Sequence, residues 1–117
     1  MTTLGAWISY PKAGRRATAL YVVSDSRITW GSQNRRWDAG RKLFAAYEQP
    51  RILGYCGDVV FPSLVLAQIV SAIDQNILFP VDAFPAIKHQ IIFDSLKTSW
   101  SGRRNCPNVS FQVVHAM

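Results

Sequence analysis

The spacing of apolar residues changes once along the chain, and this change constrains the fold more than any other feature. Up to Cys56, short runs of β-branched and aromatic residues are separated by turn residues, a pattern typical of β-strands. From residue 62 to 76, apolar residues such as Val65, Ile69 and Ile73 recur at helical spacing. Strands followed by helices in a chain of 117 residues predict one domain of the α+β class.

The strand-rich part of the chain is expected to begin with a β-hairpin. Residues 3–10 and 17–24 are strand-like and flank a turn that contains Pro11 and Gly14. The other elements predicted in this part are a bend with a short strand (25–31), a loop (32–40) and two strands (41–47 and 52–56).

Two helices and a final strand are predicted in the rest of the chain. The first helix has Asp58 just before it and Pro62 in its first turn, where proline is tolerated. Asp82 is the predicted N-cap of the second helix, and Pro85 lies in its first turn. The apolar stripe expected on the second helix is Phe84, Ile87, Ile91 and Leu96. The last predicted elements are a loop at 101–108 and a strand at 109–116.

Composition excludes several classes of protein. Apolar residues make up 49% of the chain and charged residues 17%, which is too apolar for an intrinsically disordered chain. No apolar run approaches the ~18 residues of a membrane span, and the first residues lack a signal-peptide pattern, so we predict a cytoplasmic protein with no membrane partner. The two Cys and two His follow no metal-binding spacing, so no metal or cofactor is expected.

A threonine at position 2 gives the chain a candidate nucleophile. Thr2 is small enough for the initiator Met1 to be removed, which would make Thr2 the N-terminal residue. A free N-terminal threonine carries a hydroxyl and an amine whose ordinary pKa is about 7.7–8.0, so the amine can serve as a base near neutral pH. Having both groups on one residue supplies part of the proximity that catalysis requires.

Two further motifs accompany this threonine. An apolar strand is followed by Asp25-Ser-Arg-Ile-Thr-Trp-Gly31, and the turn Gly54-Tyr-Cys-Gly-Asp58 leads into the first helix, with Lys42 between them. With Thr2 and the order of strands and helices, these motifs resemble the proteasome β-subunit and HslV family of N-terminal nucleophile (Ntn) hydrolases. The resemblance covers most of the chain and implies the N-terminal portion of an αββα sandwich with threonine-peptidase activity.

The resemblance implies a role for each matched catalytic residue. Thr2 would attack an amide carbonyl through its hydroxyl, and the charge of Lys42 would favour the alkoxide and lower the proton affinity of the neighbouring amine. Asp25 would pair with Lys42 and hold it in place. The backbone N–H of Gly54 would donate to the oxyanion, since a glycine lets the backbone approach a ligand closely.

The resemblance also implies a substrate site and partners. Thr29 and Gly31 would line the cleft and pair by their backbone with an extended peptide or protein substrate. Two departures matter: the first hairpin is longer than usual in this family, and family members are longer chains whose second half completes the site. We therefore expect residues 1–117 to be a single, incomplete Ntn-hydrolase-like domain. The implied partners are a second copy of the chain or the missing C-terminal half, with an ATPase as a further candidate.

Two other function classes compete with the hydrolase. A catalytically inactive structural subunit or truncated remnant would keep the fold and act only through oligomerisation. A nucleic-acid-binding module would use the paired basic residues, such as Arg35 and Arg36, together with Trp30 and Trp37 for stacking. The formal net charge is +6, but no RNP, zinc or helix-turn-helix pattern accompanies it, so nucleic-acid binding is not expected.

Overall fold

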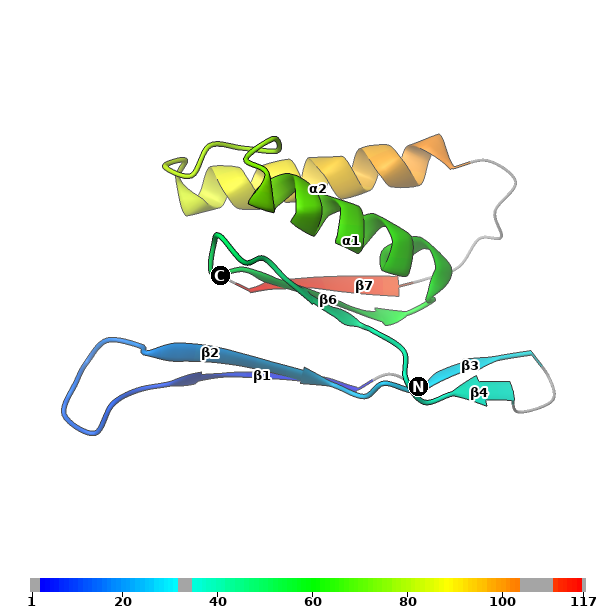
Figure 1. Ribbon diagram of the computed structural model, residues 1–117, viewed down its shortest axis with the longest axis horizontal. Coiled ribbons are helices and arrows are strands. Elements are labelled where there is room, and N and C mark those ends of the chain that lie inside the picture. Colours follow the sequence, from blue (N-terminus) through cyan, green and yellow to red (C-terminus); the bar gives the residue numbers. More distant parts are fainter. Residues whose placement is uncertain (1–2, 32–34, 104–110, 117) are drawn as a thin grey trace.

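The elements of the chain lie in three layers (Figure 1). The computed structural model describes residues 3–31, 35–103 and 111–116. Helices α1 (Val60–Asp74) and α2 (Pro85–Gly102) form one layer, a three-stranded sheet lies beneath them, and two β-hairpins form the third layer. The strands are β1 (Leu4–Ser9), β2 (Ala19–Ser24), β3 (Ile28–Trp30), β4 (Arg35–Trp37), β5 (Leu43–Ala45), β6 (Ile52–Gly57) and β7 (Phe111–Ala116).

All the strand pairs in the described part of the chain are antiparallel. β1 pairs with β2, and β3 pairs with β4. The middle sheet has the order β5-β6-β7, and its register places Gly54 of β6 between Leu43 and Val114. The mixed α+β class predicted from the sequence is therefore confirmed.

The hydrophobic core lies between the middle sheet and the helices. Alternate residues of β6, Leu53 and Tyr55, are completely buried, as are Leu66 and Ile73 of α1. This alternation follows from the strand geometry, which sends successive side chains to opposite faces of a sheet. The remaining buried apolar side chains are Phe44, Ile69, Val70, Phe79 and Ile92. Thus β5, β6, the two helices and the segment after α1 supply the core.

Gly54 lets the hairpin layer approach the other face of the middle sheet. A Cβ at this position would lie 2.9 Å from Leu4 Cδ1 and 2.8 Å from Leu43 Cδ2, closer than ordinary van der Waals contact. The missing side chain therefore sets the spacing between β6 and β1. None of the buried core side chains comes from β1 to β4.

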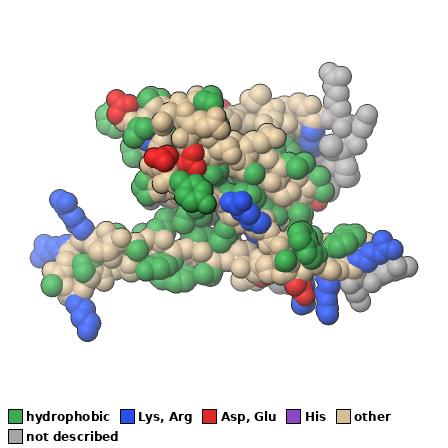
Figure 2. All heavy atoms as spheres, in the orientation of Figure 1, with side chains coloured by type: hydrophobic (Ala, Val, Ile, Leu, Met, Phe, Trp, Pro, Cys, Tyr) green, Lys and Arg blue, Asp and Glu red, His purple; other side chains and the backbone are tan. Residues whose placement is uncertain are grey.

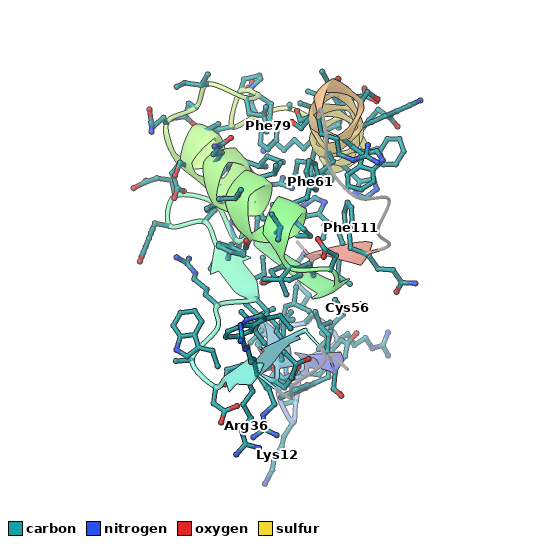
Figure 3. The ribbon with its side chains drawn as sticks, turned by 90° about the vertical axis from the view of Figure 1, so that its right-hand side faces the viewer. Lys12, Arg36, Cys56, Phe61, Phe79 and Phe111 are labelled. Carbon is teal, nitrogen blue, oxygen red and sulfur yellow. The ribbon has the colours of Figure 1, made fainter. Side chains whose placement is uncertain are left out.

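The hairpin layer exposes apolar side chains and carries basic side chains at its ends (Figure 2). Trp7 and Tyr21 face each other across β1 and β2, with their rings stacked 5.3 Å apart, and each is about half exposed. In the side view, Lys12 and Arg36 lie at the bottom of the molecule, while Phe61, Phe79 and Phe111 lie in its upper half (Figure 3). The lower layer is thus amphipathic on its outer surface.

Most elements agree with the sequence predictions, and two predictions are wrong. The predicted β1–β2 hairpin and the first helix are confirmed, and α1 ends before Asn76, which has a positive φ of 55°. The loop predicted at residues 32–40 is wrong in part, because residues 35–37 form β4 and complete a second hairpin. The Asp82 cap is also wrong, since Phe84 is the N-cap of α2 and makes no side-chain capping hydrogen bond.

The apolar stripe predicted on α2 is only partly correct. Phe84 and Ile87 are 74% and 51% exposed, whereas the buried residues of the helix are Lys88 and Ile92. Lys88 is buried because its ammonium donates to Gln49 Oε1 at 3.0 Å and to the carbonyl of Val81. A buried lysine with polar partners replaces the apolar residue that the spacing of the stripe would place there.

The helices do not have the character of membrane spans. Within residues 3–31, 35–103 and 111–116, neither helix combines the length and the apolar character needed to cross a bilayer.

Candidate active site around Lys42 and Asp25

A buried lysine and a carboxylate meet where the hairpin layer joins the middle sheet. The ammonium of Lys42 lies 3.2 Å from Asp25 Oδ2 and 3.3 Å from Asp25 Oδ1. It also donates to the backbone carbonyl of Arg27 at 2.6 Å. The Lys42 side chain is 1% exposed and that of Asp25 is 33% exposed. The structure therefore brings together two residues that stand 17 positions apart in the sequence, as the motifs predicted.

The same carboxylate holds the start of β1. The Thr3 N–H donates to Asp25 Oδ1 at 3.0 Å, and the Asp25 N–H donates to the Thr3 carbonyl at 3.2 Å. Asp25 thus binds Lys42 and the backbone of Thr3 at once. Thr2, the predicted nucleophile, lies outside the described residues, so its side chain is not placed here.

These contacts keep Asp25 ionised. Partial burial raises the pKa of its carboxyl, but the Thr3 N–H hydrogen bond and the Lys42 ammonium more than offset this effect, so the pKa lies below its usual range. A charged Asp25 in turn stabilises the ammonium of Lys42, whose removal from water would otherwise be costly. The Lys42 ammonium is therefore held in place, paired with a carboxylate, beside the first residues of β1.

The geometry of β6 bears on the oxyanion role implied for Gly54. The Tyr55 N–H donates to the carbonyl of Lys42 at 3.2 Å, so Tyr55 bonds toward β5. Hydrogen-bonded and non-bonded pairs alternate along an antiparallel ladder, so the N–H of Gly54 points the other way, toward Val114 of β7. The oxyanion role of Gly54 stays a prediction, and this direction argues against it. Gly57, at the exposed end of β6, has a φ of 97°, and its freedom serves the turn into α1.

The residues predicted to bind substrate lie on the second hairpin. Thr29 is exposed in β3 opposite Arg36, and Gly31 is exposed just after β3 with a φ of 73°. Within the described residues, β3 pairs only with β4, so its second edge is unpaired. An unpaired edge next to the Lys42–Asp25 pair is compatible with addition of an extended peptide.

Two features of the site escaped the sequence prediction. The Arg27 carbonyl accepts a hydrogen bond from the Lys42 ammonium in addition to the two oxygens of Asp25. Every residue has a backbone carbonyl, so the residue type at position 27 could not predict this contact. The Arg27 side chain points elsewhere and forms an exposed ion pair with Asp38 at 2.6 Å. Arg27 and Asp38 line a surface depression of about 640 Å³ together with Ser24, Asp25 and Ser26. A substrate group therefore has room beside the carboxylate.

Metal ligands do not gather at this site. Among the residues that the structure describes, no group of three or more His, Cys, Asp or Glu side chains could hold a metal ion. Comparison of the chain with protein-family models, curated proteins and solved structures gave no match.

Proposed function

We propose that the chain is an N-terminal-threonine amide hydrolase of the Ntn type, acting on peptide or protein substrates. The observation that carries the proposal is the double contact of Asp25, which binds the Lys42 ammonium and the Thr3 N–H together. Thr2 precedes Thr3 directly in the sequence, so the residue that follows the proposed nucleophile is held by the carboxylate that binds Lys42. The three layers are compatible with part of the αββα sandwich that the family resemblance implies.

The proposed reaction uses the hydroxyl and amine of Thr2, the ammonium of Lys42 and a water molecule. With Met1 removed, the Thr2 amine takes the proton of the Thr2 hydroxyl as the oxygen attacks the amide carbonyl carbon. The positive charge of Lys42 stabilises the negative oxygen that forms in this step. The C–N bond of the tetrahedral intermediate then breaks, the departing amine takes the proton, and an ester to Thr2 remains. Water hydrolyses this ester and regenerates the hydroxyl.

Mass spectrometry and a peptidase assay test the proposal. The intact mass should correspond to loss of Met1, and cleavage of a fluorogenic peptide should vanish in Thr2→Ala. Thr3→Ala is the matched control, because Thr3 takes part through its backbone N–H, and it should keep the activity. Lys42→Met should lower kcat by ~100-fold or more, the typical loss when a group that stabilises transition-state charge is removed. Equal cleavage by the wild type and Thr2→Ala, or activity in a protein that retains Met1, would contradict the proposal.

We propose as the second candidate a non-catalytic subunit that acts through association with other copies. The observation that favours it is the exposed apolar surface of the hairpin layer, where Trp7, Tyr21 and Val23 are each about half exposed. Sedimentation velocity should then show an oligomer that Trp7→Thr dissociates. Tyr47→Ser is the control, because Tyr47 is 95% exposed and lies outside that layer. A wild-type protein that sediments as an active monomer would refute this candidate.

A further inference from the structure

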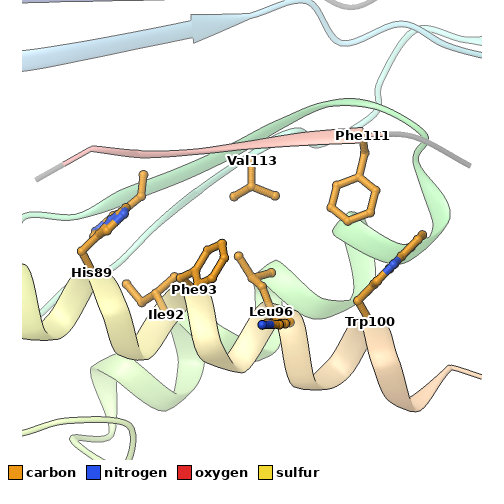
Figure 4. A pocket seen from close by; sticks show the side chains of 9 residues that line it. His89, Ile92, Phe93, Leu96, Trp100, Phe111 and Val113 are labelled. Carbon is orange, nitrogen blue, oxygen red and sulfur yellow. The ribbon is translucent and has the colours of Figure 1, made fainter.

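A second cavity lies between α2 and the edge strand β7, and the proposed hydrolase site does not use it (Figure 4). Its volume is about 420 Å³, within the range of ~300–1,000 Å³ typical of small-molecule sites. Its apolar lining residues are Ile92, Phe93, Leu96, Trp100, Phe111 and Val113, and its polar ones are His89, Lys97 and His115. It shares no lining residue with the depression beside Asp25. The cavity is therefore a separate candidate site.

The apolar part of the cavity is elongated along α2 and has aromatic rings at one end (Figure 4). Trp100 and Phe111 lie edge to face with their ring centroids 5.0 Å apart, and Phe61 packs against both. His89 lies toward the other end, 11 residues earlier on α2. At a rise of about 1.5 Å per residue the two ends are about 16 Å apart. An extended alkyl chain of medium length fits this distance.

The polar end presents a hydrogen-bond donor backed by a cation. Arg51 Nη1 lies 3.2 Å from His115 Nε2, and an arginine can only donate, so Nε2 of His115 accepts. The proton of a neutral His115 is then on Nδ1, which lies 2.9 Å from His89 Nδ1 and donates to it. The remaining proton of His89 is consequently on Nε2. The guanidinium polarises this chain of hydrogen bonds, which strengthens the final Nε2–H as a donor to an anion.

The charges around the cavity favour an anion as well. Lys97 also lines the cavity, three residues before Trp100, and no Asp or Glu belongs to the described lining. The carboxylate closest in sequence, Asp94, accepts from Gln90 at 2.9 Å and lines a different depression on the helix. An anionic head at His89 therefore meets a hydrogen-bond donor and no carboxylate of the described lining, and an apolar tail can follow the apolar residues.

We propose that this cavity binds a medium-chain fatty acid, with the carboxylate on Nε2–H of His89 and the alkyl chain directed toward Trp100 and Phe111. The site needs neither the nucleophile nor the oligomer of the proposed function. Its ligand class follows from the apolar length, the donor at the His89 end and a described lining without carboxylates. A free fatty acid and the acyl chain of a phospholipid share this chemistry, and the test separates them.

Isothermal titration calorimetry with laurate, below its micelle concentration, tests the site on the full chain. Laurate should bind with a stoichiometry of one, and dodecylammonium, which has the same tail and the opposite charge, should bind at least tenfold more weakly. His89→Ala should weaken laurate at least tenfold, because a charge-assisted hydrogen bond is lost. Phe93→Asp, at a half-exposed lining position, should abolish binding by placing a carboxylate in the cavity. Phosphatidylcholine vesicles should give no binding heat if the free acid is the ligand.

The controls keep a folding defect apart from a lost site. Gln90→Ala changes an exposed neighbour of His89 that does not line the cavity, and it should bind laurate like the wild type. Each variant is used only when its urea midpoint shows a folded protein, and Leu96→Trp, which fills the cavity, replaces Phe93→Asp if that variant unfolds. Equal binding by the wild type and the filled variant would overturn the proposal. So would equal affinity for laurate and dodecylammonium, or binding heat from vesicles alone.

Discussion

Replacing Asp25 by Asn should destabilise the protein because it leaves the buried ammonium of Lys42 without its counter-charge. Removing one partner of a fully buried ion pair costs about 3–5 kcal/mol. Here the cost should be smaller, because Asp25 is 33% exposed and the ammonium keeps the Arg27 carbonyl at 2.6 Å. We therefore expect the free energy of unfolding to fall by about 2 kcal/mol. With a slope of about 1.5 kcal/mol/M, the urea midpoint would fall by about 1.3 M.

The exposed pair in the same region supplies the matched control. Arg27 and Asp38 lie closer together, at 2.6 Å, but their side chains are 52% and 57% exposed. Asp38→Asn should therefore change the urea midpoint far less than Asp25→Asn, because water and salt already screen that pair. Burial of the cation, rather than the distance between the charges, decides the difference. Equal losses from the two variants would refute this reasoning.

The pH dependence of the Asp25→Asn effect gives a second test. The pKa of the Asp25 carboxyl is below its usual range in the folded chain, so the folded state binds fewer protons than the unfolded state. Its contribution is complete above the unfolded pKa of about 3.9 and is lost as the pH falls through the lower folded value. The gap in stability between wild type and Asp25→Asn should be full at pH 7 and shrink below pH 4. A gap that stays constant down to pH 2.5 would show that charge is not its cause.

Three further predictions use the core, the layer contact and the histidine pair. Gly54→Ala should lower the free energy of unfolding, measured in urea, by about 1–3 kcal/mol, because the new methyl group overpacks against Leu43. The double variant with Leu43→Ala should lose less than the sum of the two single losses, because both changes affect the same contact. Leu66→Ala should cost about 2–5 kcal/mol at an unchanged urea slope, since this side chain is completely buried. His115 has a pKa lowered to about 4 by burial, Arg51 and His89, so stability should fall as the pH drops from 6.5 to 4. In His115→Gln this part of the acid sensitivity should be absent when urea midpoints at pH 7 and 4.5 are compared.

The elements that were predicted well from the sequence are those in which apolar residues follow a clear pattern along the chain. The helical spacing in α1 reflects one buried face, and β1 and β2 are runs of β-branched and aromatic residues on either side of a clear turn. The structure has these elements close to the predicted bounds. β4 was missed because its residues, Arg35 to Trp37, are all exposed. A strand that buries neither face leaves no hydrophobic period, and its pairing with β3 is visible only in space.

The candidate site was predictable in part for a related reason. Asp25 and Lys42 were paired on the basis of the family resemblance, and the structure places their charged groups together. The Arg27 carbonyl, the Arg51–His115–His89 chain and the buried Lys88 depend on contacts between distant segments. Such contacts carry no local pattern, so single-sequence reasoning could not find them.

The distribution of the core has a consequence for how the molecule opens. Within the part of the chain that the structure describes, the buried core side chains belong to the helices, to β5 and β6, or to the segment that holds Phe79, and the hairpin layer supplies none. In native-state hydrogen exchange, the amides of β1 to β4 should therefore exchange through local opening of the hairpin layer, at a lower free energy than global unfolding. The amides of β6 and α1 should exchange only when the whole chain unfolds. Asp25 directly follows β2, and Lys42 directly precedes β5 of the middle sheet. The ion pair therefore links the hairpin layer to the part of the molecule that carries the core, and we expect it to break and re-form while the core remains intact.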